Sequence, residues 1–268
     1  MDNYQYCAQT AVALLNGKID TARVLDFGCG AGQVVGLLRA SSISAVGCEA
    51  FYGGGTTPAR KDIAPFIYPI HNGVVPFPAE SFDLVLNNQV MEHVEDLDAA
   101  LSEICRVAKP GGIVLSLFPD KAVWREGHCG VPFLHWFPKH SSVRVYYAYA
   151  MRSIGFGHFT QGKSRWLWTT DICDWLDKWT VYRSYDEIAD TYRRYFTPMQ
   201  HIECQWLEAR LGVIARLFPA RLGRLFVNKM AGMVFTCTKP QNAQNKVHDD
   251  SGRHFVRNGA KATVSGLA

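Results

Sequence analysis

A short glycine loop carries the residues of this chain that are best suited to bind a small charged molecule. The segment from Val24 to Gly32 reads as an apolar strand, a turn containing Gly28 and Gly30, and the start of a helix. Glycine lets the backbone approach a ligand closely, and the N–H groups at a helix start bind anionic groups. Such a loop, with an acidic residue about 20 positions later, is how α/β folds hold an adenosine-type cofactor. The acidic residue here is Glu49.

Two further residues indicate which cofactor of this type the loop would take. A dinucleotide site needs a third glycine for helix packing beside a pyrophosphate, but position 33 is Gln33. Asp26 stands just before the loop, and a carboxylate there favours a ligand with positive charge. We therefore expect S-adenosylmethionine, held by Asp26, the loop glycines (Gly28, Gly30 and Gly32), Gln33 and Glu49. The alternative is a tight turn that binds no ligand, with Glu49 as a solvated loop acid.

Four segments resemble, in the same order, the class I S-adenosylmethionine-dependent methyltransferases. The resemblance is strongest to small-molecule enzymes such as those of ubiquinone and menaquinone biosynthesis. It covers residues 22–118, with its strongest parts at 25–32, 82–86, 91–94 and 106–112. It implies that Asp26 lies near the amino group of the cofactor and that Asn72, where the family often has Asp, meets the adenine. His93 lies near the cofactor in many relatives, although it could equally be a structural histidine.

The end of the fourth expected strand supplies the next candidate residues. Asn87 and Asn88 follow an apolar run and would line the transfer site beneath the methyl group. A simple polar loop is the alternative interpretation. A carboxylate such as Glu49, at the end of the second expected strand, can accept hydrogen bonds from both ribose hydroxyls.

Acid–base residues are concentrated in positions 124–136, directly after the fifth expected strand. Glu126, His128 and His135 lie there among tryptophans, Gly and Pro. Histidine titrates near neutral pH, which suits removal of a hydroxyl proton during methyl transfer. We expect His128 to be the base, with Glu126 or His135 orienting it or the acceptor. A metal site of these three residues is an alternative, but their spacing matches no metal motif, so no metal is expected; a plain surface loop is another.

The elements that must position these residues alternate between strands and helices. This alternation predicts an α/β fold, a Rossmann-like three-layer sandwich with a mostly parallel sheet. The expected strands are 22–27, 44–49, 66–70, 82–87, 112–118, 199–204 and 232–238, and the expected core helices are 4–16, 31–40 and 96–108. Lys109-Pro110-Gly111-Gly112 is expected to be a turn before the fifth of these seven strands. The resemblance implies that the last strand runs antiparallel.

The chain divides into four expected parts. Residues 1–118 form the cofactor-binding core, 119–197 an aromatic-rich helical insertion or lid for the acceptor, 198–240 the rest of the core, and 241–268 a flexible tail. Within the insertion we expect one helix over 142–153. A second is expected over 185–196, begun by a capping box at Ser184.

Composition limits the partners and the compartment. The 268 residues are 48% hydrophobic and 19% charged, with a net charge of +4 and no run of Lys and Arg, so a nucleic-acid partner is not expected. The eight cysteines include no Cys-x-x-Cys pair, which is typical of a reduced compartment. With no signal core and no apolar stretch of about 20 residues, we expect a cytoplasmic protein. Residues 210–226 mix basic and apolar side chains; we expect a covering helix, with membrane contact as the less favoured alternative.

These observations together predict methyl transfer from S-adenosylmethionine to a small-molecule or glycan hydroxyl. The aromatic insertion suits stacking on a sugar or a flat ring, and its Glu-Gly-His run resembles polysaccharide-associated methyltransferases. The alternatives are C- or N-methylation of a quinone-like or natural-product acceptor, and a regulatory protein that binds S-adenosylmethionine without turnover. Neither the acceptor nor the oligomeric state follows from the sequence.

Overall fold

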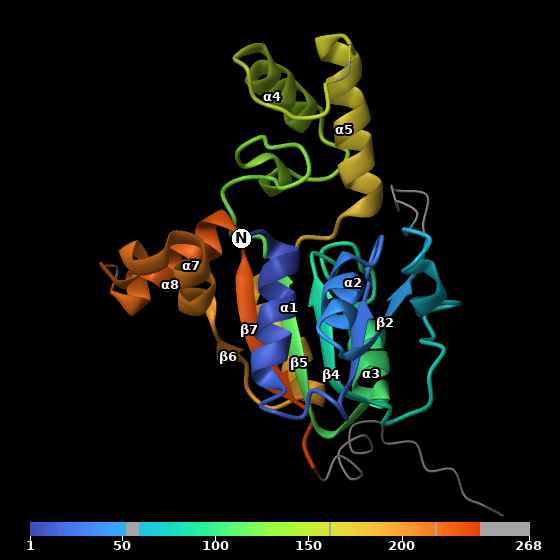
Figure 1. Ribbon diagram of the computed structural model, residues 1–268. Helices are drawn as coiled ribbons and strands as arrows, with labels where there is room; N and C mark the ends of the chain where they lie inside the picture. Colours follow the sequence, from blue (N-terminus) through green and yellow to red (C-terminus); the bar gives the residue numbers. More distant parts are fainter. Residues whose placement is uncertain (52–58, 161, 218, 242–268) are drawn as a thin grey trace, which may run out of the picture.

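The centre of the molecule is one twisted sheet of seven strands (Figure 1). The computed structural model describes residues 1–51, 59–160, 162–217 and 219–241. The strand order is β3-β2-β1-β4-β5-β7-β6. The first five strands pair in parallel, whereas β7 runs antiparallel to β5 and β6 antiparallel to β7. The strands are β1 (Arg23–Phe27), β2 (Ser44–Glu49), β3 (Ile67–Pro69), β4 (Phe82–Asn88), β5 (Ala108–Phe118), β6 (Gln200–His201) and β7 (Met233–Thr238).

Helices cover both faces of this sheet and make it the middle of three layers. One apolar cluster joins a face of the sheet to α1 (Asn3–Leu14), α2 (Gln33–Ala40), α7 (Glu203–Leu211) and α8 (Ala220–Met230). The other joins the opposite face to α3 (Leu97–Val107) and α6 (Tyr185–Tyr195). Side chains alternate along each strand, so Leu84 and Leu86 enter the first cluster and Val85 the second. The predicted α/β sandwich and its antiparallel last strand are confirmed.

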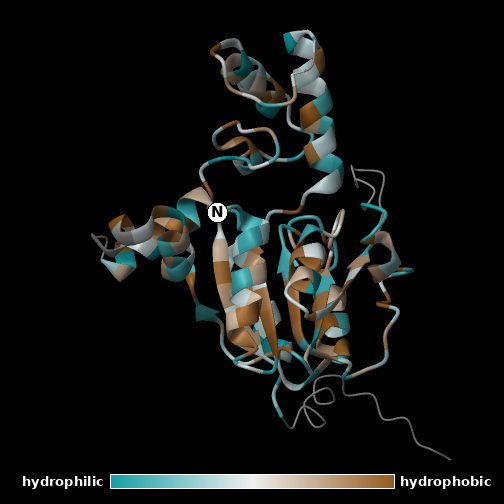
Figure 2. Ribbon diagram, in the orientation of Figure 1, coloured by the Kyte–Doolittle hydropathy of each residue, from teal (hydrophilic) through white to brown (hydrophobic). Residues whose placement is uncertain are grey.

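A separate helical unit rises above the carboxyl ends of the parallel strands (Figure 1). It contains α4 (Ser142–Ser153) and α5 (Arg165–Trp179) and has its own apolar cluster around Leu134, Trp168 and Leu176. Figure 2 shows apolar residues filling the sheet and patches of them on α4 and α5. We call residues 119–183 the insertion. Helix α6, expected to belong to the insertion, instead packs against α3 in the core.

Local signals explain where several helices begin. Asp96 accepts a hydrogen bond from the N–H of Ala99 and caps α3, and Ser184 does the same for α6 through the N–H of Glu187. Helix α4 spans the range that the sequence predicted.

Two strand predictions differ from the structure. Strand β5 begins at Ala108, because the segment expected to be a turn is carried within the strand as an irregularity in its pairing with β4. Gly111 permits this with a φ of 75°, in the left-handed region. Strand β6 is only two residues long because α7 already begins at Glu203.

The basic segment 210–226 does not form one helix. It ends α7, passes through a 3-10 turn and continues as α8 after Pro219. Ala215 within the segment, and Leu207 and Val227 on either side of it, belong to the apolar cluster on this face of the sheet, as expected of a covering element. Within the described residues, no helix is both long and apolar enough to cross a bilayer. The tail predicted for 241–268 lies, beyond position 241, outside the described residues.

Candidate active site

A cleft of about 470 Å³ opens at the carboxyl ends of β1, β2 and β4. Ligands bind at this edge in open α/β sheets, where the strand order reverses. Its wall includes the loop that follows β1, residues 28–31, together with Gln33, Glu49 and His93. Of these, Gly28, Gly30, Gln33, Glu49 and His93 were predicted from the sequence. It missed Asp2, Asn3, Tyr4 and Arg210, which reach the cleft from α1 and α7 and whose sequence context carries no binding signal.

The loop after β1 has a conformation that requires glycine. Gly28, Gly30 and Gly32 have φ values of 73°, 54° and 76°. A Cβ atom at Gly28 would lie 2.5 Å from the Val90 side chain, whereas one at Gly30 would meet nothing within 4 Å. The backbone is therefore bare toward the cleft at Gly30. Gly32 faces Ile63 and Ile67 and begins α2 without a side-chain cap, which leaves the N–H groups of the first helical turn available for an anion.

Two buried carboxyl groups stand beside the loop. Glu49 accepts hydrogen bonds from the N–H groups of Gly30 at 2.7 Å and Ala50 at 2.8 Å. Each carboxylate oxygen retains a further lone pair for a ligand hydroxyl. Burial, and then the charge of Glu49, raises the pKa of Asp26 to about 8. Two such acids in one cleft favour a ligand with positive charge.

The two asparagines at the end of β4 have different environments. Successive side chains of a strand point to opposite faces. Asn88 lines the cleft, and its buried Oδ1 has no hydrogen-bond partner among the described residues. Asn87 points into the core and donates to the Ser116 hydroxyl at 2.9 Å, so the prediction that it contacts the cofactor is not supported.

Asn72 also lies apart from the cleft. It is exposed, has a φ of 52° and forms with Gly73 the two-residue turn between His71 and Val74. Asn-Gly is the pair that such a tight hairpin favours. The turn therefore explains this residue, and the structure does not place it against an adenine.

Glu126 organises the acid–base residues of the insertion. Its carboxylate is fully buried and accepts from the His128 Nδ1 at 2.7 Å, the Tyr182 hydroxyl at 2.6 Å and the Cys129 N–H at 2.7 Å. Burial alone would raise the pKa of Glu126, but these donors and the charge of His128 lower it to about 2. Burial alone would lower the pKa of His128, but Glu126 outweighs this and raises it.

His128 meets the cleft through His93. Their Nε2 atoms are 3.1 Å apart, and the Nδ1 of His93 is 2.7 Å from the carbonyl oxygen of Trp179. Because His93 lines the cleft, this histidine pair joins the cleft to the insertion. Burial lowers the pKa of His93. The predicted Glu126–His128 pair is thus formed, but no local pattern indicated that His93 would be its neighbour.

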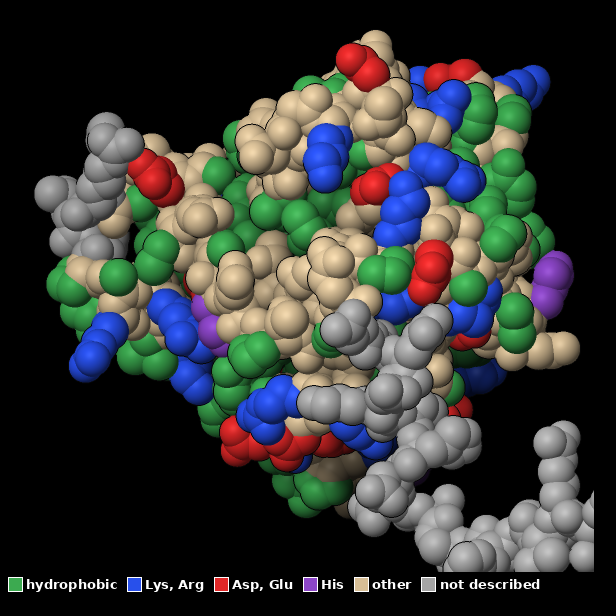
Figure 3. Space-filling view, turned by 90° about the horizontal axis from the view of Figure 1, so that it is seen from below, with side chains coloured by type: hydrophobic (Ala, Val, Ile, Leu, Met, Phe, Trp, Pro, Cys, Tyr) green, Lys and Arg blue, Asp and Glu red, His purple; other side chains and the backbone are tan. Residues whose placement is uncertain are grey.

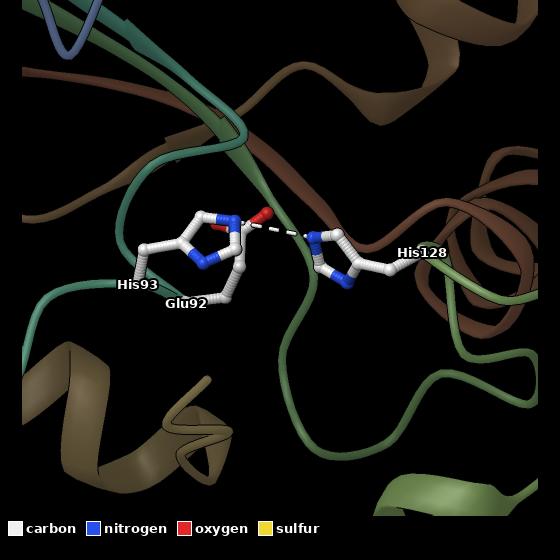
Figure 4. Close-up of side chains that lie close together, drawn as sticks. All are labelled: Glu92, His93 and His128. Carbon is white, nitrogen blue, oxygen red and sulfur yellow. Dashed lines mark hydrogen bonds between the residues drawn. The ribbon is translucent and has the colours of Figure 1, made fainter. Parts of the chain in front are cut away.

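The third predicted acid–base residue, His135, is set aside from this pair. Its ring packs on Tyr182 with centroids 4.4 Å apart, and it lines a second cavity of about 310 Å³. Burial lowers the pKa of His135 to about 4. Among the described residues, the potential metal-binding atoms that lie close together belong to Glu92, His93 and His128, and not to Glu126, His128 and His135 (Figure 4).

The cleft fits the chemistry of S-adenosylmethionine. Its bare glycine backbone and uncapped helix start suit a carboxylate, and its two buried acids suit an ammonium, a sulfonium and ribose hydroxyls.

Comparison with known proteins agrees with this chemistry. A family model for a methyltransferase domain matches residues 2–178. The chain is similar to a ubiquinone biosynthesis O-methyltransferase of Rhizobium rhizogenes, with 34% identity over 100 residues that cover 36% of this chain and 40% of the relative. It is also similar to a malonyl-[acyl-carrier protein] O-methyltransferase of Salmonella typhimurium, with 34% identity over 113 residues that cover 41% and 43%. These matches span less than half the length of either relative.

Among solved structures, an S-adenosylmethionine-dependent methyltransferase of Mesorhizobium loti has a similar fold. The TM-score is 0.51 at 13% identity, over 88% of this chain and 100% of that one.

Proposed function

Because this chain belongs to the class I S-adenosylmethionine-dependent methyltransferase family, we propose that it methylates a hydroxyl oxygen of a small molecule. The observation that carries this proposal is the series of hydrogen bonds that runs from Glu126 through His128 to His93 at the cleft. An amine acceptor needs little help from a base, whereas a hydroxyl must lose its proton as the methyl group arrives. The two similar relatives named above are O-methyltransferases, which favours the same acceptor atom.

Different residues bind the cofactor and accept the proton in this reaction. S-adenosylmethionine supplies a methyl group on a positively charged sulfur. We assign Asp26 and Glu49 to its ammonium and ribose ends and the loop at Gly30 to its carboxylate. The hydroxyl oxygen bonds to the methyl carbon, and the carbon–sulfur bond breaks with its electrons left on sulfur. The hydroxyl proton passes to the histidine pair, where the buried Glu126 stabilises a positive charge on His128.

A sugar hydroxyl is a second candidate acceptor. Several aromatic side chains of the insertion are exposed, and rings of this kind stack on the faces of sugars. They include Trp124, Trp136, Tyr146 and Trp166.

The proposal is tested first by binding and then by transfer. Calorimetry should show that the full chain binds S-adenosylmethionine and S-adenosylhomocysteine but not NAD. Labelled methyl groups should then pass to phenols or sugars in an acceptor panel, and His128→Ala should slow that transfer while cofactor binding persists. Transfer to amines alone, at a rate unchanged in His128→Ala, would overturn the hydroxyl assignment. Cofactor binding with no transfer to any acceptor would instead favour a regulatory protein.

A further inference from the structure

We propose that Glu92, His93 and His128 bind a divalent transition-metal ion where the cleft meets the insertion. The proposal rests on the proposed function, because the ion would lie beside the acceptor hydroxyl. The metal-binding atoms of these residues lie within 4.8 Å of one another. Figure 4 shows that Glu92 and His93 come from the loop after β4, while His128 approaches from the insertion on the opposite side.

Hydrogen bonding directs both histidine Nε2 atoms at the same space. The Nδ1 of His93 faces a carbonyl oxygen, which can only accept, so this nitrogen carries a hydrogen. The Nδ1 of His128 faces the carboxylate of Glu126 and likewise carries one. In neutral rings both Nε2 atoms then present lone pairs to each other across 3.1 Å. Either a proton held by one ring or a metal ion would satisfy both nitrogens, and the metal ion would also engage the carboxylate of Glu92 beside them.

Glu92 is the second, independent observation. Its side chain is 1% exposed, and neither carboxylate oxygen has a hydrogen-bond partner among the other described residues. A buried carboxylate without hydrogen bonds is costly, and it is normally paired or bound to a metal. One of its oxygens is drawn beside the line that joins the two rings in Figure 4. The same residue therefore supplies an oxygen ligand at the place where the two nitrogens converge.

The surroundings resemble the outer shell of known metal sites. Metal-binding histidines usually donate their other N–H to a carboxylate or a backbone carbonyl, which fixes the ring and its tautomer. Here Glu126 holds His128, and the Trp179 carbonyl holds His93. Tyr182 in turn donates to Glu126 at 2.6 Å. The supporting groups are thus in place for both nitrogen ligands.

The ligand set indicates which ions would bind. Two imidazoles and one carboxylate suit Zn²⁺, Fe²⁺ and their first-row neighbours, whereas Mg²⁺ and Ca²⁺ prefer oxygen ligands alone. Nitrogens bound to a tetrahedral Zn²⁺ lie about 3.3 Å apart, close to the observed spacing. Three protein ligands leave a position for the acceptor oxygen. There the ion would polarise the hydroxyl, whose proton would leave to cleft water, and His128 would then act as a ligand instead of a base.

Metal binding is measured on the full chain after treatment with a chelator and dialysis. We expect calorimetry with Zn²⁺ to show one equivalent bound, and Co²⁺ to give the visible spectrum of a site with nitrogen and oxygen ligands. Glu92→Gln and His128→Gln should each weaken Zn²⁺ binding at least tenfold. Glu126→Gln should weaken it about 10- to 100-fold through the lost support of His128. His140→Gln, at an exposed histidine on the insertion, is the matched control and should bind like the parent.

The outcomes separate this inference from the proposed function. Calorimetry with S-adenosylmethionine shows that each variant is folded, because none of the substituted residues is assigned to the cofactor. A parent protein that binds no Zn²⁺, or variants that bind it as the parent does, would overturn the metal site. Methylation of a hydroxyl in the presence of chelator would do so as well, while leaving the O-methyltransferase proposal standing. One equivalent of Zn²⁺ lost in Glu92→Gln, with no hydroxyl acceptor found, would support the site and leave the function in doubt.

Discussion

At the scale of single residues, the charge of Asp26 links cofactor binding to pH. Burial and Glu49 raise the pKa of Asp26 to about 8 in the ligand-free protein, so the carboxyl is mostly protonated at neutral pH. A positively charged ligand favours the ionised form. Binding of S-adenosylmethionine below about pH 8 should therefore release a proton, and affinity should rise with pH by up to tenfold per unit until the carboxyl is ionised in both states.

Calorimetry in buffers with different ionisation enthalpies measures this proton release. Asp26→Asn keeps the shape of the side chain and removes its titration, so the variant should bind more weakly and lose the part of the pH dependence that belongs to Asp26. An unchanged pH profile in the variant would show that Asp26 does not ionise on binding.

The residues that sequence reasoning placed well are those whose partners lie nearby along the chain or at a shared strand end. Glu126 and His128 are two positions apart, and Glu49 meets Gly30 because the ends of β1 and β2 adjoin. Glu92 and Tyr182 were not selected. Their importance arises from contacts between segments far apart in the chain, which no local pattern encodes. Glu92 lies beside His128, 36 positions later, and Tyr182 donates to Glu126, 56 positions earlier.

At the scale of elements, caps and turns decided which boundaries could be predicted. Helices α4 and α6 began where serines and polar residues indicated. The predicted start of β5 was wrong. A Lys-Pro-Gly-Gly segment usually ends strand pairing, but here it lies within the strand as an irregularity in its pairing with β4. The membership of α6 was also misjudged. Its buried Ile188 and Tyr192 belong to the core cluster beneath the sheet, and the sequence shows only that this helix is amphipathic.

The cap of α6 gives a prediction with an internal control. Ser184 accepts from the N–H of Glu187, so Ser184→Ala should lower the free energy of unfolding by about 1 kcal/mol. Ser141 occupies the same position on α4 but makes no side-chain cap hydrogen bond, so Ser141→Ala should have little effect. Urea denaturation of both variants measures the difference. Equal losses would show that the Ser184 hydrogen bond does not stabilise the helix start.

At the scale of the whole molecule, the site depends on how the insertion joins the core. Among the described residues, the face opposite the insertion carries lysine and arginine side chains interspersed with aspartate and glutamate (Figure 3). The candidate active site lies at the opposite end of the sheet. There His93 belongs to the core and His128 to the insertion, so the histidine pair exists only while the two parts are held together.

Arg183 is the residue best placed to hold them. It is 8% exposed and donates to the carbonyl oxygens of Met91, Val94 and Glu95 at 3.2, 2.8 and 2.6 Å. These three bonds tie the end of the insertion to the loop that carries Glu92 and His93. Arg183→Met would remove three hydrogen bonds from a charged donor, one to a buried carbonyl and two to partly buried ones, and we expect a loss of about 3 kcal/mol in stability.

The same variant should impair transfer more than cofactor binding, because the cleft acids lie on β1 and β2 while the histidine pair spans the loosened junction. Hydrogen exchange should quicken at the Val181 N–H, which donates to the Glu92 carbonyl across this junction. Arg194→Met is the matched control. This arginine is more than half exposed and pairs with Asp98, so the substitution should change neither the transfer rate nor hydrogen exchange at Val181. The prediction would be contradicted if Arg183→Met changed neither hydrogen exchange at Val181 nor the transfer rate. The insertion would then be held by its apolar contacts, and the alignment of His128 with His93 would not depend on Arg183.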